Sequence, residues 1–420
     1  MAEPASALTA GPAGSAGTTG TVGTVETQYL DLPGPVRLDC GLDLHPVRVA
    51  YETYGELSPR RDNVILVCHA LSGDAHAAGF AKTPPEESTR DGFGAEDRDG
   101  SAGKGLGWWD GMIGPGKAFD TDRFFVVSTN LLGGCRGTTG PSSIDPATGM
   151  PYGPDFPVIT VGDMVRTQRA FLDALGIERL AAVAGGSLGG MQAFEWAIQF
   201  PDQVDAIVAI ASTHALYPQG VAWNAIARNA IMGDPAWQGG RYYGTGRKPD
   251  AGMGVARMVG HVTYLSAPAL DDKFGRRLQF ADDIRYTITE PEFEVESYLR
   301  HQAESFVRRF DANTYLYTSR ALTYFDLARQ YGGSLSRALG PVRARTLLIA
   351  FSSDWLYPPS ASREIEEALR ALGKPVDCHV IEAPYGHDCF LLEEARQTPI
   401  IRQFLSKHSL ADGRSAGTGR

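Results

Sequence analysis

The segment around Ser187 constrains the fold of this chain more than any other stretch of its sequence. The apolar run 180–184 has the length and composition of a buried strand, and it leads into the pentapeptide G-G-S-L-G at 185–189. An amphipathic stretch then runs over 188–200 and stops at Pro201, as a helix does. Strand, tight turn and helix form a nucleophile elbow, in which glycines permit a turn that raises the serine hydroxyl above the sheet. We therefore expect a covalent intermediate on Ser187.

Two further residues follow in the order that completes a catalytic triad. Asp354 lies in the loop after the apolar run 347–351, and His387 lies in the loop after the strand-like run 378–382. An imidazole can take the proton of the serine near neutral pH, and a buried carboxylate fixes its tautomer. Alone, Asp354 could be a turn aspartate and His387 an ordinary loop histidine. Their order after the serine favours the triad Ser187–Asp354–His387.

The composition predicts a soluble globular protein. The chain has 420 residues, of which 43% are apolar and 21% charged. Its net charge of −10 argues against broad binding to nucleic acids or anionic membranes, which require a basic surface. No stretch approaches eighteen consecutive apolar residues, so no membrane span is expected. The five cysteines form no C-x-x-C pair and the first basic residue is Arg37, which predicts a reducing, cytoplasmic location without a signal peptide.

The order of the expected elements predicts an α/β fold with a helical insertion. Strands are expected at 47–54, 64–69, 124–128 and 206–211, and a helix at 161–175. The alternation over 26–213 predicts a mostly parallel sheet flanked by helices, with 47–54 as an exposed strand. Residues 214–330 read as helices that form a lid over the strand ends, or else pad the flank, and the sheet domain resumes over 331–409. The tails 1–25 and 410–420 are expected to be disordered.

Acyl transfer also needs N–H donors aimed at the oxyanion of the tetrahedral intermediate. The expected donors are the backbone N–H groups of Leu188, next to the nucleophile, and of Leu71, in the loop after an early strand. The same loop carries His69, Asp74 and His76, which could instead bind zinc or iron. Because no H-x-H or H-E-x-x-H pattern accompanies them, we expect no metal site.

Two glycine-rich segments, 133–140 and 239–246, have the composition of phosphate-binding loops. Neither matches G-x-x-x-x-G-K-[ST], and neither has the strand–helix context of a dinucleotide site. We expect both to be shaped loops, the first of which could line the active site.

Five segments carry a family resemblance. They are CHALSGDAHAAG at 68–79, GGCRGTTGPS at 133–142, GGSLGGMQ at 185–192, ARMVGHVTYL at 256–265 and GHDCFL at 386–391. Together they resemble the homoserine O-acetyltransferase family of methionine biosynthesis, and the resemblance runs from about residue 27 to 409. It implies an α/β-hydrolase fold, acetyl-CoA as co-substrate and no further cofactor.

The resemblance also implies roles for individual residues. Ser187 would be acetylated by acetyl-CoA, and His387 would then deprotonate the hydroxyl of L-homoserine. Arg257 would hold the α-carboxylate of the amino acid and Asp388 its α-ammonium group, with Tyr264 in the same pocket. The chemistry agrees, because a planar guanidinium grips a carboxylate through two parallel hydrogen bonds. Arg257 could instead be a lid arginine in a surface ion pair.

Several alternatives stay open at this point. Enzymes that use succinyl-CoA or acylate L-serine share the fold and triad, and a serine ester hydrolase or a non-catalytic small-molecule receptor could use the same scaffold. The resemblance implies a homodimer formed through the lid, although the aromatic residues at 290–330 could equally be the lid's own core. These residues are Phe293, Tyr298, Phe306, Phe310, Tyr315 and Tyr317. The phosphates of coenzyme A require a local cluster of Lys or Arg, which the sequence does not place.

Overall fold

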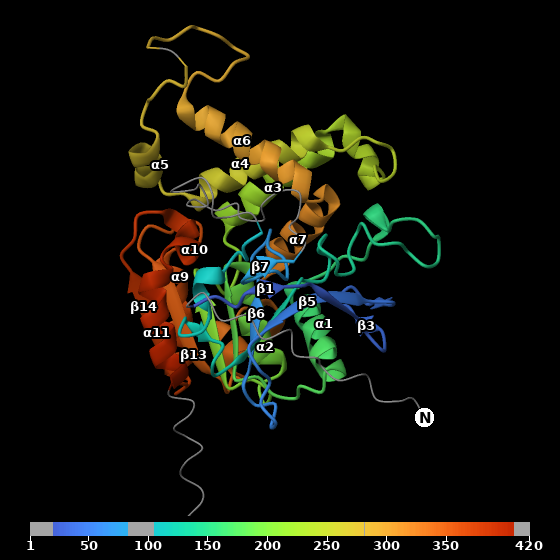
Figure 1. Ribbon diagram of the computed structural model, residues 1–420, viewed down its shortest axis with the longest axis vertical. Helices are drawn as coiled ribbons and strands as arrows, with labels where there is room; N and C mark the ends of the chain where they lie inside the picture. Colours follow the sequence, from blue (N-terminus) through green and yellow to red (C-terminus); the bar gives the residue numbers. More distant parts are fainter. Residues whose placement is uncertain (1–19, 83–104, 281, 407–420) are drawn as a thin grey trace, which may run out of the picture.

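An eight-stranded sheet forms the centre of the molecule (Figure 1), in the order β14-β13-β12-β11-β6-β10-β5-β2. The computed structural model describes residues 20–82, 105–280 and 282–406. The six strands from β14 to β10 are parallel, whereas β5 pairs antiparallel with β10 and β2 with β5. The predicted, mostly parallel sheet is confirmed. The strands are β2 (Gln28–Asp31), β5 (Arg48–Tyr54), β6 (Val64–Cys68), β10 (Phe125–Thr129), β11 (Ala182–Gly186), β12 (Ala206–Ile210), β13 (Arg345–Phe351) and β14 (Val376–Ile381).

Helices cover both faces of this sheet, because alternate side chains of each strand point to opposite faces. Leu66 of β6 belongs to the core beneath one set of helices, and its neighbour Val67 belongs to the core on the other face. The first face is covered by α1 (Val161–Ala174), α2 (Leu188–Gln199), α8 (Leu335–Leu339) and α9 (Pro359–Ala371). The second is covered by α10 (Cys389–Leu392) and α11 (Glu394–Ser406). Short 3-10 turns are η1 (Asp110–Met112), η2 (Gly153–Asp155), η3 (Pro235–Gly240), η4 (Arg329–Tyr331) and η5 (Gly386–Asp388).

Three two-stranded ladders lie outside the main sheet. They are β1 (Thr24–Val25) with β7 (Phe80–Ala81), β3 (Val36–Arg37) with β4 (Asp43–Leu44), and β8 (Ile113–Gly114) with β9 (Phe119–Asp120). The first ladder corrects the tail predicted over 1–25, because its last two residues pair with the segment that follows β6. The rest of that prediction over 1–19, and the tail at 410–420, lie outside the described residues.

The strand β5 is buried, although its sequence predicts an exposed strand. Only its first residue is exposed. The strand β2 occupies the edge of the sheet beyond it, so β5 has a neighbour on each side. Its polar residue Glu52 accepts hydrogen bonds from the hydroxyls of Thr27 and Tyr54, both at 2.8 Å, which removes the need for water.

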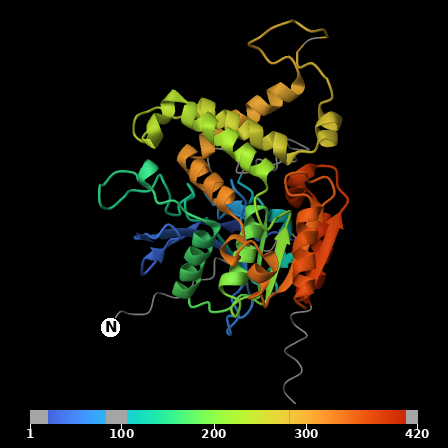
Figure 2. The same ribbon diagram turned by 180° about the vertical axis from the view of Figure 1, so that it is seen from behind.

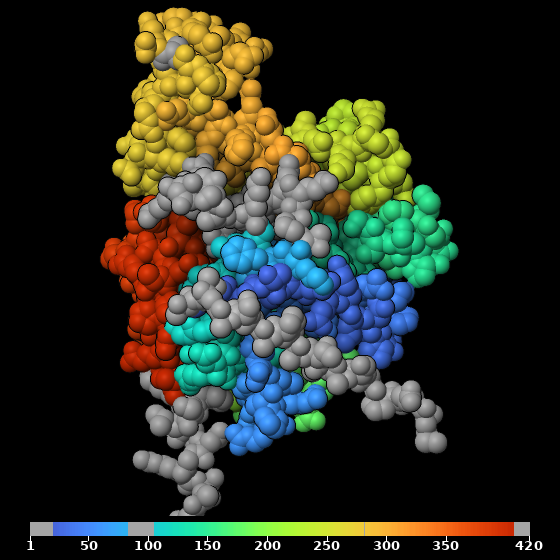
Figure 3. Space-filling model, viewed as in Figure 1, coloured from blue at the N-terminus to red at the C-terminus, as the bar shows by residue number. Residues whose placement is uncertain are grey.

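Five helices between β12 and α8 form a helical layer at one end of the body, seen from both sides in Figures 1 and 2. Its helices are α3 (Pro218–Gly233), α4 (Asp250–Tyr264), α5 (Ala267–Lys273), α6 (Glu294–Arg309) and α7 (Ala312–Tyr324). In Figure 3 this layer, coloured yellow-green to orange, caps the blue and red parts of the body. Four of the aromatic residues considered for a dimer are buried inside the lid itself. These residues are Tyr298, Phe306, Phe310 and Tyr315.

Two further features concern the environment of the chain. Over the described ranges, no helix combines the length and the apolar character that crossing a bilayer requires. All five cysteines are free, and Cys68 and Cys389 are buried.

Candidate active site

The nucleophile elbow lies between β11 and α2. Ser187 has φ 57° and ψ −121°, a strained conformation for a residue with a side chain, and its N–H donates to the carbonyl of Ile210 at 2.9 Å. A Cβ on Gly185 would lie 2.5 Å from the carbonyl oxygen of Cys68, and one on Gly189 would lie closer still. These two glycines are therefore required by the close approach of β6, and the turn that results exposes the serine hydroxyl.

The three predicted triad residues meet at this turn. His387 Nε2 lies 2.9 Å from Ser187 Oγ, and His387 Nδ1 lies 2.7 Å from Asp354 Oδ2. The other carboxylate oxygen of Asp354 accepts the backbone N–H groups of Leu356 at 3.0 Å and Tyr357 at 2.9 Å. Asp354 and His387 are 2% and 3% exposed, so the relay is shielded from water. The three side chains thus form a hydrogen-bonded array in the order serine, histidine, aspartate.

The environment of His387 suits a base that becomes charged during reaction. Burial lowers its pKa, but the hydrogen-bonded Asp354 carboxylate and the nearby charge of Asp388 together outweigh burial and raise the pKa above its ordinary value. An imidazolium at this position is therefore stabilised by the carboxylate behind it.

The loop after β6 carries one of the two expected oxyanion donors. Leu71 lines the same cavity as Ser187, and Leu188 is the first residue of α2, whose N–H has no intrahelical acceptor. The ring of His69 fixes this loop, since Nδ1 donates to the carbonyl of Ala70 at 2.6 Å and Nε2 accepts the N–H of Leu131 at 3.1 Å. Burial lowers the pKa of His69, consistent with a neutral ring.

The side chains that suggested a metal site have other partners. His76 Nδ1 lies 3.0 Å from Glu52, and its Nε2 lies 2.8 Å from the carbonyl of Gly105. Asp74 Oδ1 accepts the backbone N–H of His76 at 2.9 Å. Across the residues that the structure describes, no three His, Cys, Asp or Glu side chains cluster as metal ligands would.

A small cavity of about 50 Å³ lies above the nucleophile. Both the lid and the catalytic body contribute its walls, which supports a lid over the strand ends rather than padding at the flank. The lining residues are Leu71, Ser187, Leu216, Gly220, Trp223, Asn224, Val259, Gly260, Thr263, Tyr264, Tyr315, Leu322, Leu356 and Tyr357.

Tyr357 is a residue of this cavity that the sequence analysis missed. Its ring lies 5.0 Å from the ring of His387 at 90°, and it lines the cavity together with Ser187. Burial raises the pKa of Tyr357 well above its usual range, so the phenol is a neutral hydrogen-bonding group. The available signal was its position three residues after Asp354, in the same loop.

The residues expected to hold the amino acid converge on the same region. Arg257 is 3% exposed and its guanidinium carbon lies 4.5 Å from the ring centroid of Phe306, so a surface ion pair is the wrong description. Asp388 is also buried. Burial raises the pKa of Tyr264, while Arg257 lowers it and Asp388 raises it, which shows that both charges act on this hydroxyl.

Hydrogen bonds fix the lid to the two loops that carry Asp354 and His387. Trp355 Nε1 donates to the carbonyl of Leu265 at 2.8 Å, and the hydroxyl of Ser266 donates to the carbonyl of Pro384. Gly386 has φ +78°, and a Cβ there would lie 2.6 Å from the backbone nitrogen of Ser266. The turn that ends α4 therefore sets the position of the histidine loop.

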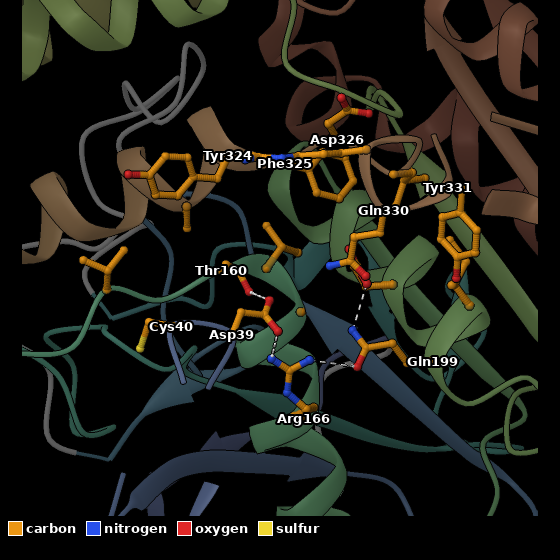
Figure 4. Close-up of a pocket in the computed structure, with 18 residues that line it drawn as sticks. Asp39, Cys40, Thr160, Arg166, Gln199, Tyr324, Phe325, Asp326, Gln330 and Tyr331 are labelled. Carbon is orange, nitrogen blue, oxygen red and sulfur yellow. Dashed lines mark hydrogen bonds and ion pairs between the residues drawn. The ribbon is translucent and has the colours of Figure 1, made fainter. Parts of the chain in front are cut away.

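A larger cavity, of about 730 Å³, lies away from the triad between α1, α2 and residues 324–331 (Figure 4). Asp39 accepts hydrogen bonds there from Thr160 and Arg166, both at 2.5 Å, and Arg166 also donates to Gln199 at 3.3 Å. None of the predicted site residues lines it. The chemistry of the side chains, and not the volume of the cavity, therefore marks the active site.

Comparisons with known proteins agree with this fold. A family model described as the alpha/beta hydrolase fold matches residues 63–394. A homoserine O-succinyltransferase of Alkalilimnicola ehrlichii is 52% identical over 90% of this chain and 94% of its own length. A homoserine O-acetyltransferase of Methanococcus vannielii is 48% identical over 91% of this chain and 73% of its own.

Solved structures show the same likeness. The homoserine O-acetyltransferase from Bacillus anthracis has a TM-score of 0.80 and 31% identity, covering 91% of this chain and 98% of that one. Esterase E22 has a TM-score of 0.77 and 31% identity, covering 91% of this chain and all of that one (100%).

Proposed function

We propose that this chain, which belongs to the homoserine O-acetyltransferase family of the α/β-hydrolase fold, transfers an acetyl group from acetyl-CoA to the hydroxyl of L-homoserine. The observation that carries the proposal is the hydrogen-bonded array of Ser187, His387 and Asp354 beneath a helical lid. The product would serve methionine biosynthesis, and acetyl-CoA would be a co-substrate, with no resident cofactor.

The first half-reaction would acylate the nucleophile. His387 Nε2 takes the proton of Ser187 as its oxygen attacks the thioester carbon, and the N–H groups of Leu188 and Leu71 stabilise the oxyanion. The carbon–sulfur bond then breaks, and the imidazolium returns its proton to the departing thiolate. Free coenzyme A and acetyl-Ser187 result.

The second half-reaction would transfer the acetyl group to the amino acid. Arg257 binds the α-carboxylate and Asp388 the α-ammonium group, which directs the side-chain hydroxyl toward the ester. His387 removes the hydroxyl proton, the new oxygen–carbon bond forms, and Ser187 leaves with that proton. Two separate half-reactions predict ping-pong kinetics, with parallel lines in double-reciprocal plots.

The cavity above Ser187 supports acetyl as the donor group. Its volume is about 50 Å³, and none of its lining residues in the described part of the chain is Lys, Arg or His. A succinyl group is larger than an acetyl group and ends in a carboxylate. That carboxylate would lack a cationic partner among the side chains that line this cavity. Succinyl-CoA and L-serine remain the alternatives within the family, since one relative is a succinyltransferase.

Mass spectrometry of the intact protein tests donor and acceptor together. We expect exposure to acetyl-CoA to add one acetyl mass, which L-homoserine then removes, while L-serine leaves it in place. Ser187→Ala, the matched control, should gain no mass. A stable succinyl adduct that L-homoserine removes would assign the succinyl donor instead.

A serine ester hydrolase is the second candidate, because esterase E22 shares the fold at 31% identity. A transferase must keep water from the acyl-enzyme, which a closed site beneath a lid favours. We expect purified protein to release thiol from acetyl-CoA far faster when L-homoserine is present. Equal rates with and without it would identify a hydrolase, and full biological activity of Ser187→Ala would identify a receptor.

We also infer a homodimer formed through the lid, in the cytoplasm. The supporting observation is a set of exposed apolar residues on two packed lid helices: Ile226 and Met232 of α3, and Val255 and Val262 of α4. Exposed apolar patches of this kind mark protein contacts. We expect twice the monomer mass by light scattering, and a monomer for the double variant Val255→Glu/Val262→Glu.

The five free cysteines support the proposed location in the cytoplasm, which is a reducing compartment.

A further inference from the structure

A second cavity, of about 230 Å³, lies where three separate stretches of the chain meet. The loop after β10, the segment before α4 and the junction of α6 with α7 form its walls. The glycine-rich segments 133–140 and 239–246 both reach it, through Cys135 and Tyr242. It shares no lining residue with the cavity above Ser187. Two segments that the reaction does not use therefore meet at one separate site.

Cationic side chains surround this second cavity. Lys248, Arg308 and Arg309 line it, and Arg136 follows Cys135 on the loop. Burial raises the pKa of the Cys135 thiol to about 11, and the charge of Asp311 also raises it, while the charges of Arg136 and Arg309 lower it. Charged groups of both signs therefore act on this thiol. The cavity is a local basic site on a chain whose net charge is −10.

Two carboxylates also line the cavity, Asp250 and Asp311. Asp311 is occupied as the N-cap of α7, because it accepts the N–H of Thr314 at 2.8 Å. It also accepts the hydroxyls of Tyr242 at 2.5 Å and Tyr243 at 2.9 Å. These three hydrogen bonds hold the Asp311 carboxylate in place, and the three lining cations outnumber the two lining carboxylates.

The basic cavity borders the loop that carries the oxyanion donor. Arg309 donates to the carbonyl of Ser72 at 3.2 Å, and Ser72 follows Leu71 in the chain. The ring of Phe306 contacts two guanidinium groups, with Arg257 at 4.5 Å and Arg309 at 5.0 Å from its centroid. Ser72 therefore links the two cavities, because it contacts Arg309 of the basic cavity and follows Leu71, which lines the cavity above Ser187.

We propose that this basic cavity binds the phosphate groups of the acyl-CoA donor, with Lys248, Arg308 and Arg309 as the cations. The inference rests on the proposed function. In acyl-CoA the thioester is joined to the phosphates by the long pantetheine arm, so the phosphates must bind outside the small cavity above the nucleophile. Arginine recognises phosphate through paired hydrogen bonds, and lysine does so as a point charge.

Steady-state kinetics with three donors tests the proposal. The donors are acetyl-CoA, acetyl-dephospho-CoA, which lacks the 3′-phosphate, and S-acetylpantetheine, which lacks the nucleotide. For Lys248→Ala and Arg308→Ala, the ratio of kcat/KM for acetyl-CoA to that for S-acetylpantetheine should fall about tenfold, the effect of one lost charge-assisted contact. Lys248→Glu should lower it further, because it adds repulsion. Arg300→Ala, an exposed arginine of the same helix α6, is the matched control.

Acetyl-dephospho-CoA identifies which phosphate the cavity binds. We replace acetyl-CoA by acetyl-dephospho-CoA in the kcat/KM ratio. If the variants still lower that ratio tenfold, the cavity binds the pyrophosphate. If they no longer lower it, the cavity binds the 3′-phosphate. Variants that keep the wild-type ratio would overturn the proposal. So would variants that lower kcat/KM equally for acetyl-CoA and for S-acetylpantetheine. A wild-type protein that acetylates L-homoserine from no donor would instead refute the proposed function, so the two failures are distinguishable.

Discussion

Two carboxylates act on one imidazole at the centre of the site. Asp354 holds His387 Nδ1 at 2.7 Å, and Asp388, the next residue in the chain, adds a second negative charge nearby. Both raise the pKa of His387 against the lowering effect of burial. Only Asp354 orients the ring, so the two contributions can be separated by substitution.

The acidic limb of the acylation rate should report this raised pKa. His387 must be neutral to accept the serine proton, so the rate rises with pH through a midpoint above the ordinary histidine value of about 6.5. Asp388→Asn removes one charge that raises the pKa and should move the midpoint to lower pH. The measurement is the burst of thiol from acetyl-CoA as a function of pH. Asp202→Asn, an exposed control, should not move it. An upward shift in Asp388→Asn would contradict the assignment.

Arg257 should affect the two half-reactions unequally. If it clamps the α-carboxylate, Arg257→Ala should raise KM for L-homoserine by about one to two orders of magnitude, the cost of a charge-assisted contact. Arg257→Lys should lie between this variant and the wild type, because it keeps the charge without the planar fork. Single-turnover acylation and deacylation, measured separately, provide the comparison. Equal losses in both steps would show that Arg257 supports the lid and does not bind the substrate.

At the scale of elements, the apolar strands were the most predictable part of the fold. The run that predicts β6 ends within one residue of the observed strand, because five consecutive apolar side chains suit a strand buried on both faces. The strand before the nucleophile differs more, since β11 begins at Ala182 and continues through two glycines that the sequence assigns to the turn. The sequence does not predict this continuation, because glycine has no side chain that could contribute to a pattern of apolar and polar residues.

The parts that the sequence could not predict depend on contacts between distant segments. The burial of β5 follows from β2 taking the sheet edge, which no local pattern in β5 reveals. Tyr357 lines the cavity of Ser187 and packs against His387 only because the acid loop folds over the elbow. The triad could be predicted because each of its residues follows a recognisable strand. The cations of the second cavity, Lys248, Arg308 and Arg309, come from two distant stretches with no shared pattern.

The turn that ends α4 yields a prediction for the lid. Gly386→Ala must adopt φ +78° and also place its Cβ 2.6 Å from the backbone of Ser266. Gly373→Ala is the matched control, because its φ of +68° is similar and nothing lies within 4 Å of its Cβ. We expect the control to lose about 1–2 kcal/mol of unfolding free energy, and Gly386→Ala about 1–3 kcal/mol more together with most of its activity. Equal losses in urea unfolding would show that the close contact is unimportant.

At the scale of the whole molecule, the buried ring of His76 joins three stretches of the chain through its contacts with Glu52 and Gly105. His76 Nε2 donates to the carbonyl of Gly105 at 2.8 Å, and a carbonyl can only accept. Nδ1 faces the carboxylate of Glu52 at 3.0 Å, so both ring nitrogens are placed as donors and the ring suits the imidazolium form. Burial lowers the pKa of His76, but Glu52 and its other acceptors raise it overall.

This pair makes the stability of the whole molecule depend on pH in a defined direction. Because the folded pKa of His76 is raised, its contribution is fully present below the unfolded value of about 6.5 and is lost as pH rises through the folded pKa. His76→Gln leaves Glu52 buried without a cation, which should cost about 3–5 kcal/mol at pH 6. The deficit relative to the wild type should shrink as pH rises through that pKa. His379→Gln, on an exposed position of β14, should stay within about 0.5 kcal/mol of the wild type. Urea unfolding at pH 6, 7, 8 and 9 measures all three proteins, and a deficit that grows with pH would show that His76 is buried as the neutral ring.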